Sequence, residues 1–238
     1  MNKKMTLEIR RGMRDAIPIC CGYLAVSFTF GMAAMASGLT WGGATLISIT
    51  NLTSAGQFAG LSVIAVAAPY LEMALAQFVI NLRYALMSLS LSQKLDPSIT
   101  RLERMIIAFS VTDESFALVS SQEGKVSKCY IYGIMSVCII SWTVGTFFGA
   151  VASTALPPMV TSAMGIAIYG MFLAIIIPPA KKEKAITKVI IIAVVLSSLL
   201  YFVPVFKSIT PGFAIVICTI IGSVAGAIIH PIKEEAKE

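Results

Sequence analysis

Arg83 is the side chain whose chemistry fits its surroundings least, because it lies in a predominantly apolar run over 70–92. That run is long enough to cross a bilayer, which takes about 20 apolar residues in a helix. A charge at the centre of such a helix costs roughly 2.5–3.5 kcal/mol on insertion scales. Arg83 therefore indicates a ligand contact, an ion pair, or a side chain that extends from part depth to the interface.

Polar side chains accompany Arg83 along the same run. They are Gln77, Asn81, Tyr84 and Ser88, at intervals of four, three and four residues. This spacing places them on one face of a helix, which in a membrane must face the bundle interior or water. The face could bind a polar ligand, or it could join helices by hydrogen bonds. Glu72 lies about 16 Å from Arg83 along the helix axis, so the two cannot pair.

A polar stretch over 51–57 interrupts the apolar region 39–68. Its candidate site residues are Ser54, Gly56 and Gln57, because the amides at the N-terminus of a half-helix attract a carboxylate. The alternative is close helix packing, since GxxxG patterns mostly serve that purpose. Such patterns occur at Gly56/Gly60, Gly145/Gly149 and Gly222/Gly226.

Asp113 and Glu114 are adjacent acids that interrupt a weakly apolar segment over 105–121. A buried acid there could carry a proton or balance a substrate ammonium group, whereas a solvated pair would lie at the cytoplasmic surface. A cation at Arg83, these acids and the break at 51–57 together suit a zwitterion in an apolar pocket, because desolvated charges need partners.

The composition places these residues in a polytopic all-α membrane protein. Of the 238 residues, 57% are hydrophobic and 13% charged, against about 25% charged in soluble domains. Mean hydropathy is +0.87, and the apolar runs do not alternate as they would in a β-barrel. We expect one transmembrane transporter domain over 1–238 in the cell membrane, in contact with the lipid bilayer.

Several function classes are disfavoured. The formal charge of +6 comes from clusters in short connecting segments, and no basic face with interleaved aromatic residues indicates nucleic acid. The five cysteines lack metal-binding spacing, and the one histidine is His230. We therefore predict no metal, no cofactor and no catalytic residue, since no nucleophile–base pair is present.

The basic segments 1–14, 94–104, 125–128 and 181–188 should be cytoplasmic, as should both termini, 1–15 and 231–238. Six full spans follow, at about 16–37, 70–92, 127–152, 161–179, 186–203 and 211–229. Two segments, 39–68 and 105–121, are then broken or re-entrant. The alternative is seven to eight simple spans, which places 94–104 outside. A signal peptide is the alternative to a retained first helix.

Motifs along the chain resemble those of the AzlC family, the large subunits of bacterial branched-chain amino acid exporters. The similar segments are Pro18-Ile-Cys-Cys-Gly22, Phe30-Gly31, Ser54-Ala-Gly-Gln-Phe58, Asn81-Leu-Arg-Tyr84 and Thr112-Asp-Glu114. The chain departs from the family pattern at Gly56, where serine is usual, and at Tyr84, where histidine is usual. Loss of that histidine removes a group that titrates near neutral pH.

The resemblance implies a secondary exporter of valine, leucine, isoleucine or methionine. It also implies the proton gradient as the driving force and a small hydrophobic AzlD-like subunit as the partner. Arg83, directly or through Asn81 and the backbone of 54–58, would orient the substrate carboxylate. Asp113 or Glu114 would handle a proton or the ammonium group. A channel or transporter for another small organic solute or anion is the alternative.

Overall fold

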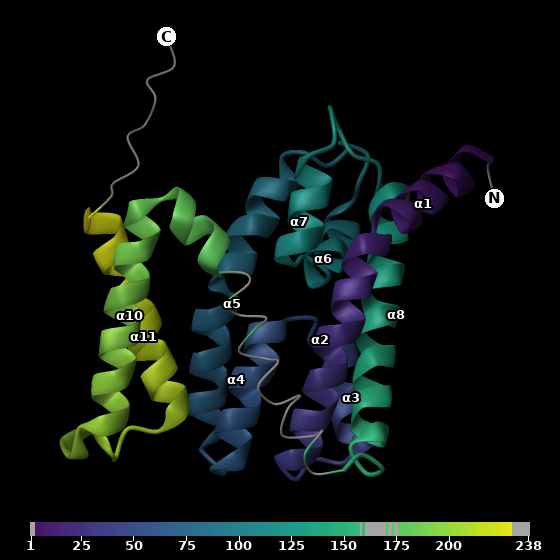
Figure 1. Ribbon diagram of the computed structural model, residues 1–238. Helices are drawn as coiled ribbons and strands as arrows, with labels where there is room; N and C mark the ends of the chain where they lie inside the picture. The colour runs from purple at the N-terminus through teal and green to yellow at the C-terminus, as the bar shows by residue number, and fades with distance from the viewer. Residues whose placement is uncertain (1–2, 158, 160–169, 171–172, 174–175, 230–238) are drawn as a thin grey trace. The chain divides into compact units, whose positions relative to one another are not determined.

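The computed structural model describes residues 3–157, 159, 170, 173 and 176–229 (Figure 1). Within them the chain is helical, with one isolated β-bridge between Leu95 and Val126. The helices are α1 (Lys3–Asp15), α2 (Ile17–Ala36), α3 (Trp41–Thr50), α4 (Ser54–Ala65), α5 (Tyr70–Ser92), α6 (Arg101–Phe109), α7 (Asp113–Ser120), α8 (Lys128–Ala152), α10 (Lys184–Phe202) and α11 (Pro211–Ile229). A 3-10 turn, Pro204–Phe206, lies between the last two.

Five of these helices, α2, α5, α8, α10 and α11, are long and apolar enough to cross a membrane. They coincide with five predicted spans to within two residues, which confirms the polytopic all-α fold. The sixth predicted span, 161–179, lies largely outside the described residues. Both predicted interruptions are present, at 51–53 and at 110–112. The rest of the predicted polar stretches, 54–57 and 113–114, lies in the first turns of α4 and α7.

The chain divides into two compact units. Unit 1 contains 1–58 and 81–166, and unit 2 contains 59–80 and 167–238. Helix α5 begins in unit 2 and ends in unit 1.

Helix α8 is the axis of unit 1 and packs along α1, α2 and α3. Glycines let the backbones of α2 and α8 touch. A Cβ at Gly31 would overlap the Thr146 carbonyl oxygen, and one at Gly149 would overlap that of Phe28. The Gly145/Gly149 pattern therefore serves close helix packing, the alternative that its spacing left open.

Helices α6 and α7 form a re-entrant pair. Lys94 Nζ, before α6, donates to the carbonyl of Ser120 at the end of α7. Lys128, the first residue of α8, forms an ion pair of 2.7 Å with Glu103 on the first turn of α6. Since the pair starts and finishes at the N-terminal end of α8, 105–121 does not make one crossing.

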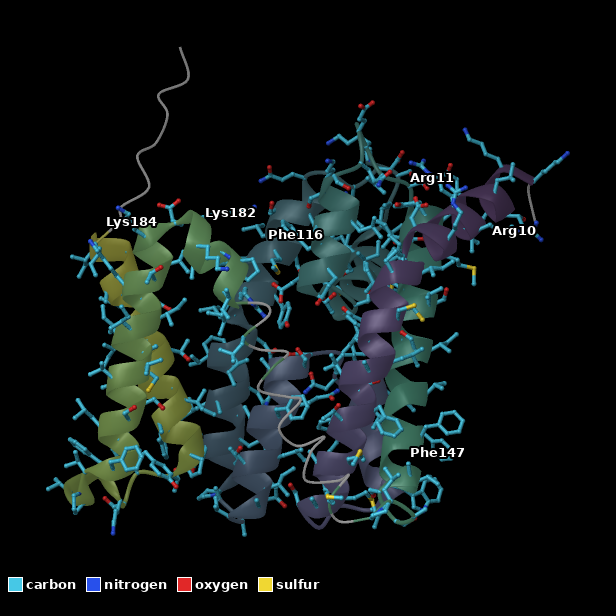
Figure 2. All side chains as sticks on the ribbon, in the orientation of Figure 1. Arg10, Arg11, Phe116, Phe147, Lys182 and Lys184 are labelled. Carbon is cyan, nitrogen blue, oxygen red and sulfur yellow. The ribbon has the colours of Figure 1, made fainter. Side chains whose placement is uncertain are left out.

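Basic segments gather at this same end of unit 1, which we call the basic end. Arg11 of α1 donates to Gln122 at 2.7 Å, and Ser127 donates to Glu8 at 3.1 Å. Figure 2 shows Arg10 and Arg11 toward this end and Phe147 toward the opposite end of α8. The segments 1–14, 94–104 and 125–128 therefore share one side, as the charge pattern predicts.

Helix α3 packs against the C-terminal part of α8. The Trp41 ring lies 5.8 Å from that of Phe147, and Ser48 Oγ lies 2.7 Å from Thr146 Oγ1. With 10 residues, α3 is only about 15 Å long. The chain then breaks, so the region 39–68 does not contain one uninterrupted crossing helix.

In unit 2, α10 packs against α11, and α4 contacts α5 at Gly60. Gly60 faces Met73 and Gln77, and Gly226 faces Val189. A Cβ at Gly226 would lie 3.0 Å from Val189 Cγ2, so Gly222/Gly226 supplies close helix packing, whereas the Gly60 contacts have ordinary van der Waals distances.

Candidate functional site

The first break, 51–53, is held by hydrogen bonds from the start of α4. Gly56 N donates to Thr53 Oγ1 at 3.2 Å, so the Thr53 hydroxyl caps the helix. Gln57 is 2% exposed. Its Nε2 donates to the Asn51 carbonyl, and its Oε1 accepts from Trp142 Nε1 at 3.1 Å. Gln57, a predicted substrate ligand, thus has both ends of its amide engaged within the protein.

The second break, 110–112, is held by a capping box at the start of α7. Thr112 N donates to Ser115 Oγ at 2.9 Å, and Ser115 N donates to Thr112 Oγ1 at 3.2 Å. The Tyr23 hydroxyl of α2 lies 2.5 Å from Thr112 Oγ1 and 2.9 Å from Glu114 Oε2. Glu114 is therefore a hydrogen-bond acceptor at the second break.

A pair of buried aromatic residues connects the two breaks. The rings of Tyr23 and Trp142 meet edge to face with centroids 5.0 Å apart. Trp142 bonds to the first break through Gln57, and Tyr23 bonds to the second through Thr112. Sequence reasoning missed Tyr23 and Trp142. The available signal was their type alone, because a buried Tyr or Trp in an apolar helix needs a hydrogen-bond partner.

A small pocket of about 160 Å³ lies where the breaks approach α5. Its lining comprises Thr50, Asn51, Leu52, Thr53, Asn81, Tyr84, Ala108, Phe109 and Val111. Asn81 and Tyr84 belong to the predicted polar face, so half of that face reaches the pocket. The other predicted substrate ligands, Ser54, Gly56, Gln57, Gln77 and Arg83, are not part of this lining.

Arg83 pairs with Asp113. Its Nη2 lies 2.9 Å from Asp113 Oδ2, and both side chains are about half-exposed. The same nitrogen donates to the Tyr84 hydroxyl at 3.0 Å, and the guanidinium lies over the Tyr84 ring at 4.9 Å. Of the three explanations for Arg83, the structure contains the ion pair.

Two broken segments that meet at a pocket within a bundle of apolar spans are typical of membrane transporters, where irregular backbone at membrane depth lines a cavity. The site and fold thus define a polytopic membrane protein of transporter type. The AzlC protein family matches residues 18–156, and the chain belongs to this family. The matched segment includes α2 through α8, and with them both breaks, Arg83 and the acids.

Relatives agree with this assignment. The inner membrane protein YgaZ of Escherichia coli is 24% identical over 74% of both chains. A membrane protein of Archaeoglobus fulgidus is 30% identical over 72% of this chain and 76% of its own length. A membrane protein of Helicobacter pylori is 26% identical over 62% of this chain and 67% of its own. No solved structure matches.

Proposed function

We propose that this chain exports branched-chain or other hydrophobic amino acids, such as valine, leucine, isoleucine and methionine, across the cell membrane. The proton gradient would drive export, and a small hydrophobic AzlD-like subunit would complete the transporter. Membership of the AzlC family supports a transport role. The observation that carries the proposal is the pocket lined by both breaks and by Asn81 and Tyr84.

The chemistry of the surroundings fits a small zwitterion. An amino acid carries a carboxylate and an ammonium group, and Arg83 and Asp113 offer the complementary charges 2.9 Å apart. A substrate that arrives beside this pair can replace it with two new ion pairs. The pocket of about 160 Å³ is smaller than the roughly 300–1,000 Å³ pockets that hold drug-sized ligands, which favours a small solute.

Roles for the individual residues follow from these positions. Arg83 would hold the carboxylate, with Asn81 and Tyr84 of the pocket as neutral donors. The first turn of α4 (Ser54, Gly56, Gln57), where the Gly56 amide and the Gln57 side chain already bond within the protein, would shape the first break. Asp113 or Glu114 would hold the ammonium group or a proton. Gln77 belongs to unit 2 and would contribute to the transport path rather than to this pocket.

The charge distribution supports cytoplasmic termini. Three of the four basic segments share the basic end of unit 1, and cytoplasmic loops carry an excess of Lys and Arg. Substrate would then enter the pocket from the side on which α6 and α7 begin and end.

A transporter of another organic anion is the second candidate, favoured by the half-exposed guanidinium of Arg83. A thermal-shift screen of the purified chain against amino acids and organic acids separates the two. Stabilisation by leucine or valine but not by organic acids supports the first candidate, and the reverse supports the second.

The test of the proposal is a transport assay in vesicles that contain this chain and its small subunit. Labelled valine, leucine or methionine should move under a proton gradient, and absence of movement for all three would refute the proposal. Arg83→Ala should abolish movement. Arg83→Lys should also fail if the guanidinium grips a carboxylate with two donors, because lysine cannot do so. Arg101→Ala, at an exposed arginine of α6, is the matched control.

A further inference from the structure

Helix α1 carries a basic face that the site described above does not use. The helix contains five basic and two acidic side chains. Intervals of four, three and four residues place the following side chains on one face, which we call the outer face: Lys3, Leu7, Arg10 and Arg14. All of them are exposed, and the exposed fraction of Leu7 is 59%. The outer face therefore combines cationic groups with apolar surface.

The opposite face of α1 packs on α8 and fixes the helix in place. A Cβ at Gly12 would overlap the Tyr130 carbonyl oxygen, and one at Gly133 would overlap that of Ile9. The backbones of the two helices therefore touch. Figure 2 shows Arg10 projecting from α1 away from α8. The outer face is thus a surface of a packed helix, turned away from the rest of unit 1.

The two acids of α1 bond within the protein. Glu8 accepts a hydrogen bond of 3.1 Å from Ser127. Asp15 accepts one of 3.1 Å from the Tyr130 hydroxyl and lies 3.3 Å from Arg14 Nε. The acids therefore balance part of the charge on the inner side of the helix and at its last turn, and the positive charge farther along the outer face stays unbalanced.

Helix α1 also lies at the level where the first span meets the membrane surface. Helix α2 has 20 residues, so it is about 30 Å long, the thickness of the hydrocarbon core. Ala16 N donates to the Gly12 carbonyl at 3.1 Å, and Cys20 N donates to the Ala16 carbonyl at 3.0 Å, so the helix continues from α1 into α2. Figure 1 shows α1 leaning away from the axis of α2, which keeps it near the headgroup layer.

We propose that the outer face of α1 binds the phosphate groups of anionic lipids in the leaflet at the basic end. Lys3 and Arg10, which form no ion pair within the described part of the chain, supply the charge together with Arg14. Leu7 adds apolar contact with the lipid. A basic cluster directly before a membrane span attracts anionic lipid, and buried apolar area strengthens the binding. This surface is separate from the pocket and does not depend on what the protein transports.

The first test measures lipid affinity by native mass spectrometry of the purified full chain with anionic phosphatidylglycerol or zwitterionic phosphatidylcholine. Wild type should retain phosphatidylglycerol in preference. A basic residue near a membrane surface contributes roughly fivefold in affinity, so Lys3→Gln/Arg10→Gln should weaken this binding by on the order of tenfold or more. The matched control Arg101→Gln/Lys207→Gln removes the same charge from exposed positions elsewhere and should bind as wild type does. Equal losses in both variants overturn the inference, because net charge alone would then explain the binding.

The second test locates the lipid by hydrogen exchange of the full chain in bilayers of phosphatidylcholine, alone or with an equal amount of phosphatidylglycerol. The amides of α1 should exchange more slowly in the mixed bilayer, and high salt should remove the difference because it screens surface charges. Helix α3, which contains no charged residue, should exchange equally in both and is the internal control. Equal exchange of α1 in the two bilayers overturns the inference and leaves the outer face to an acidic protein partner.

Discussion

The two helix breaks use the same cap but have different surroundings. Thr53 caps α4 and Thr112 caps α7, each with a hydroxyl that accepts at 3.2 Å from the backbone three residues on. At the first break the neighbouring polar groups are neutral and buried, with Gln57 only 2% exposed. At the second break they include Asp113, half-exposed and paired with Arg83.

This difference suggests different functional roles for the two breaks. Breaking a buried hydrogen bond between neutral groups costs free energy, and such a bond does not depend on pH. We therefore expect the first break to act as a fixed wall of the pocket. Half-exposed charges exchange partners at small cost, since exposed ion pairs contribute little to stability. The second break is therefore the one suited to respond to a charged substrate or to a proton.

The largest effect is expected at the first break, from Gln57→Leu. The substitution leaves the Trp142 indole N–H and the Asn51 carbonyl without their bonds, and each unsatisfied buried group costs about 1–3 kcal/mol. Thermal unfolding of the purified protein should show a marked fall in Tm. The matched control is Gln93→Leu, in the loop after α5, which should unfold near the wild-type temperature.

A double variant sharpens that prediction. Trp142→Phe added to Gln57→Leu removes the stranded indole donor, so part of the lost stability should return, because replacing both partners costs less than replacing one. A Tm for Gln57→Leu equal to that of wild type would show that the first break is not held in this way.

Removal of the two caps gives an intermediate effect. Loss of a threonine cap costs about 0.5–2 kcal/mol, and serine retains most of the cap. Thr112→Ala should destabilise more than Thr53→Ala, because Thr112 Oγ1 is also bonded to Tyr23. Thermal unfolding of both alanine variants, with Thr53→Ser and Thr112→Ser as controls, measures the difference. Equal losses at the two positions would mean that the Tyr23 contact contributes nothing.

The sequence predicted the elements well where a single physical rule decides them. Continuous apolar runs gave the bounds of α2, α5, α8, α10 and α11, because length and hydropathy alone determine a membrane span. The polar residues at 51–57 and 112–114 gave both breaks. The charge pattern predicted that 94–104 and 125–128 lie on the same side of the membrane. In the structure Lys125 donates to the Gln93 carbonyl and Lys128 pairs with Glu103, so the two segments are in contact.

The site was predicted less completely, because contacts between distant segments have no local signal. Arg83 and Asp113 were both selected by type, yet nothing in their spacing paired them. Tyr23 and Trp142 were not selected from the sequence, and their bonds to Thr112 and Gln57 depend on how α2 packs against α8. Glu72 was set aside as too far from Arg83, and its partner, Gly212, lies far along the chain.

The smallest effect is expected at acid pH, at the Lys128–Glu103 ion pair that joins the start of α6 to the start of α8. Hydrogen bonds from Lys128 and from Thr100 lower the pKa of Glu103 to about 2, below its ordinary value of 4.5. The pKa of Glu103 is lower in the folded state than its ordinary value of 4.5. The ion pair therefore stabilises the protein at pH values above 4.5, and this stabilisation is lost as the pH falls toward 2. Hydrogen exchange should therefore show α6 and α7 loosening in acid before α3 does. Glu103→Gln should show that looser exchange already at neutral pH, with α3 unchanged; equal acid sensitivity of α3 and α6 would remove the contrast between the two breaks.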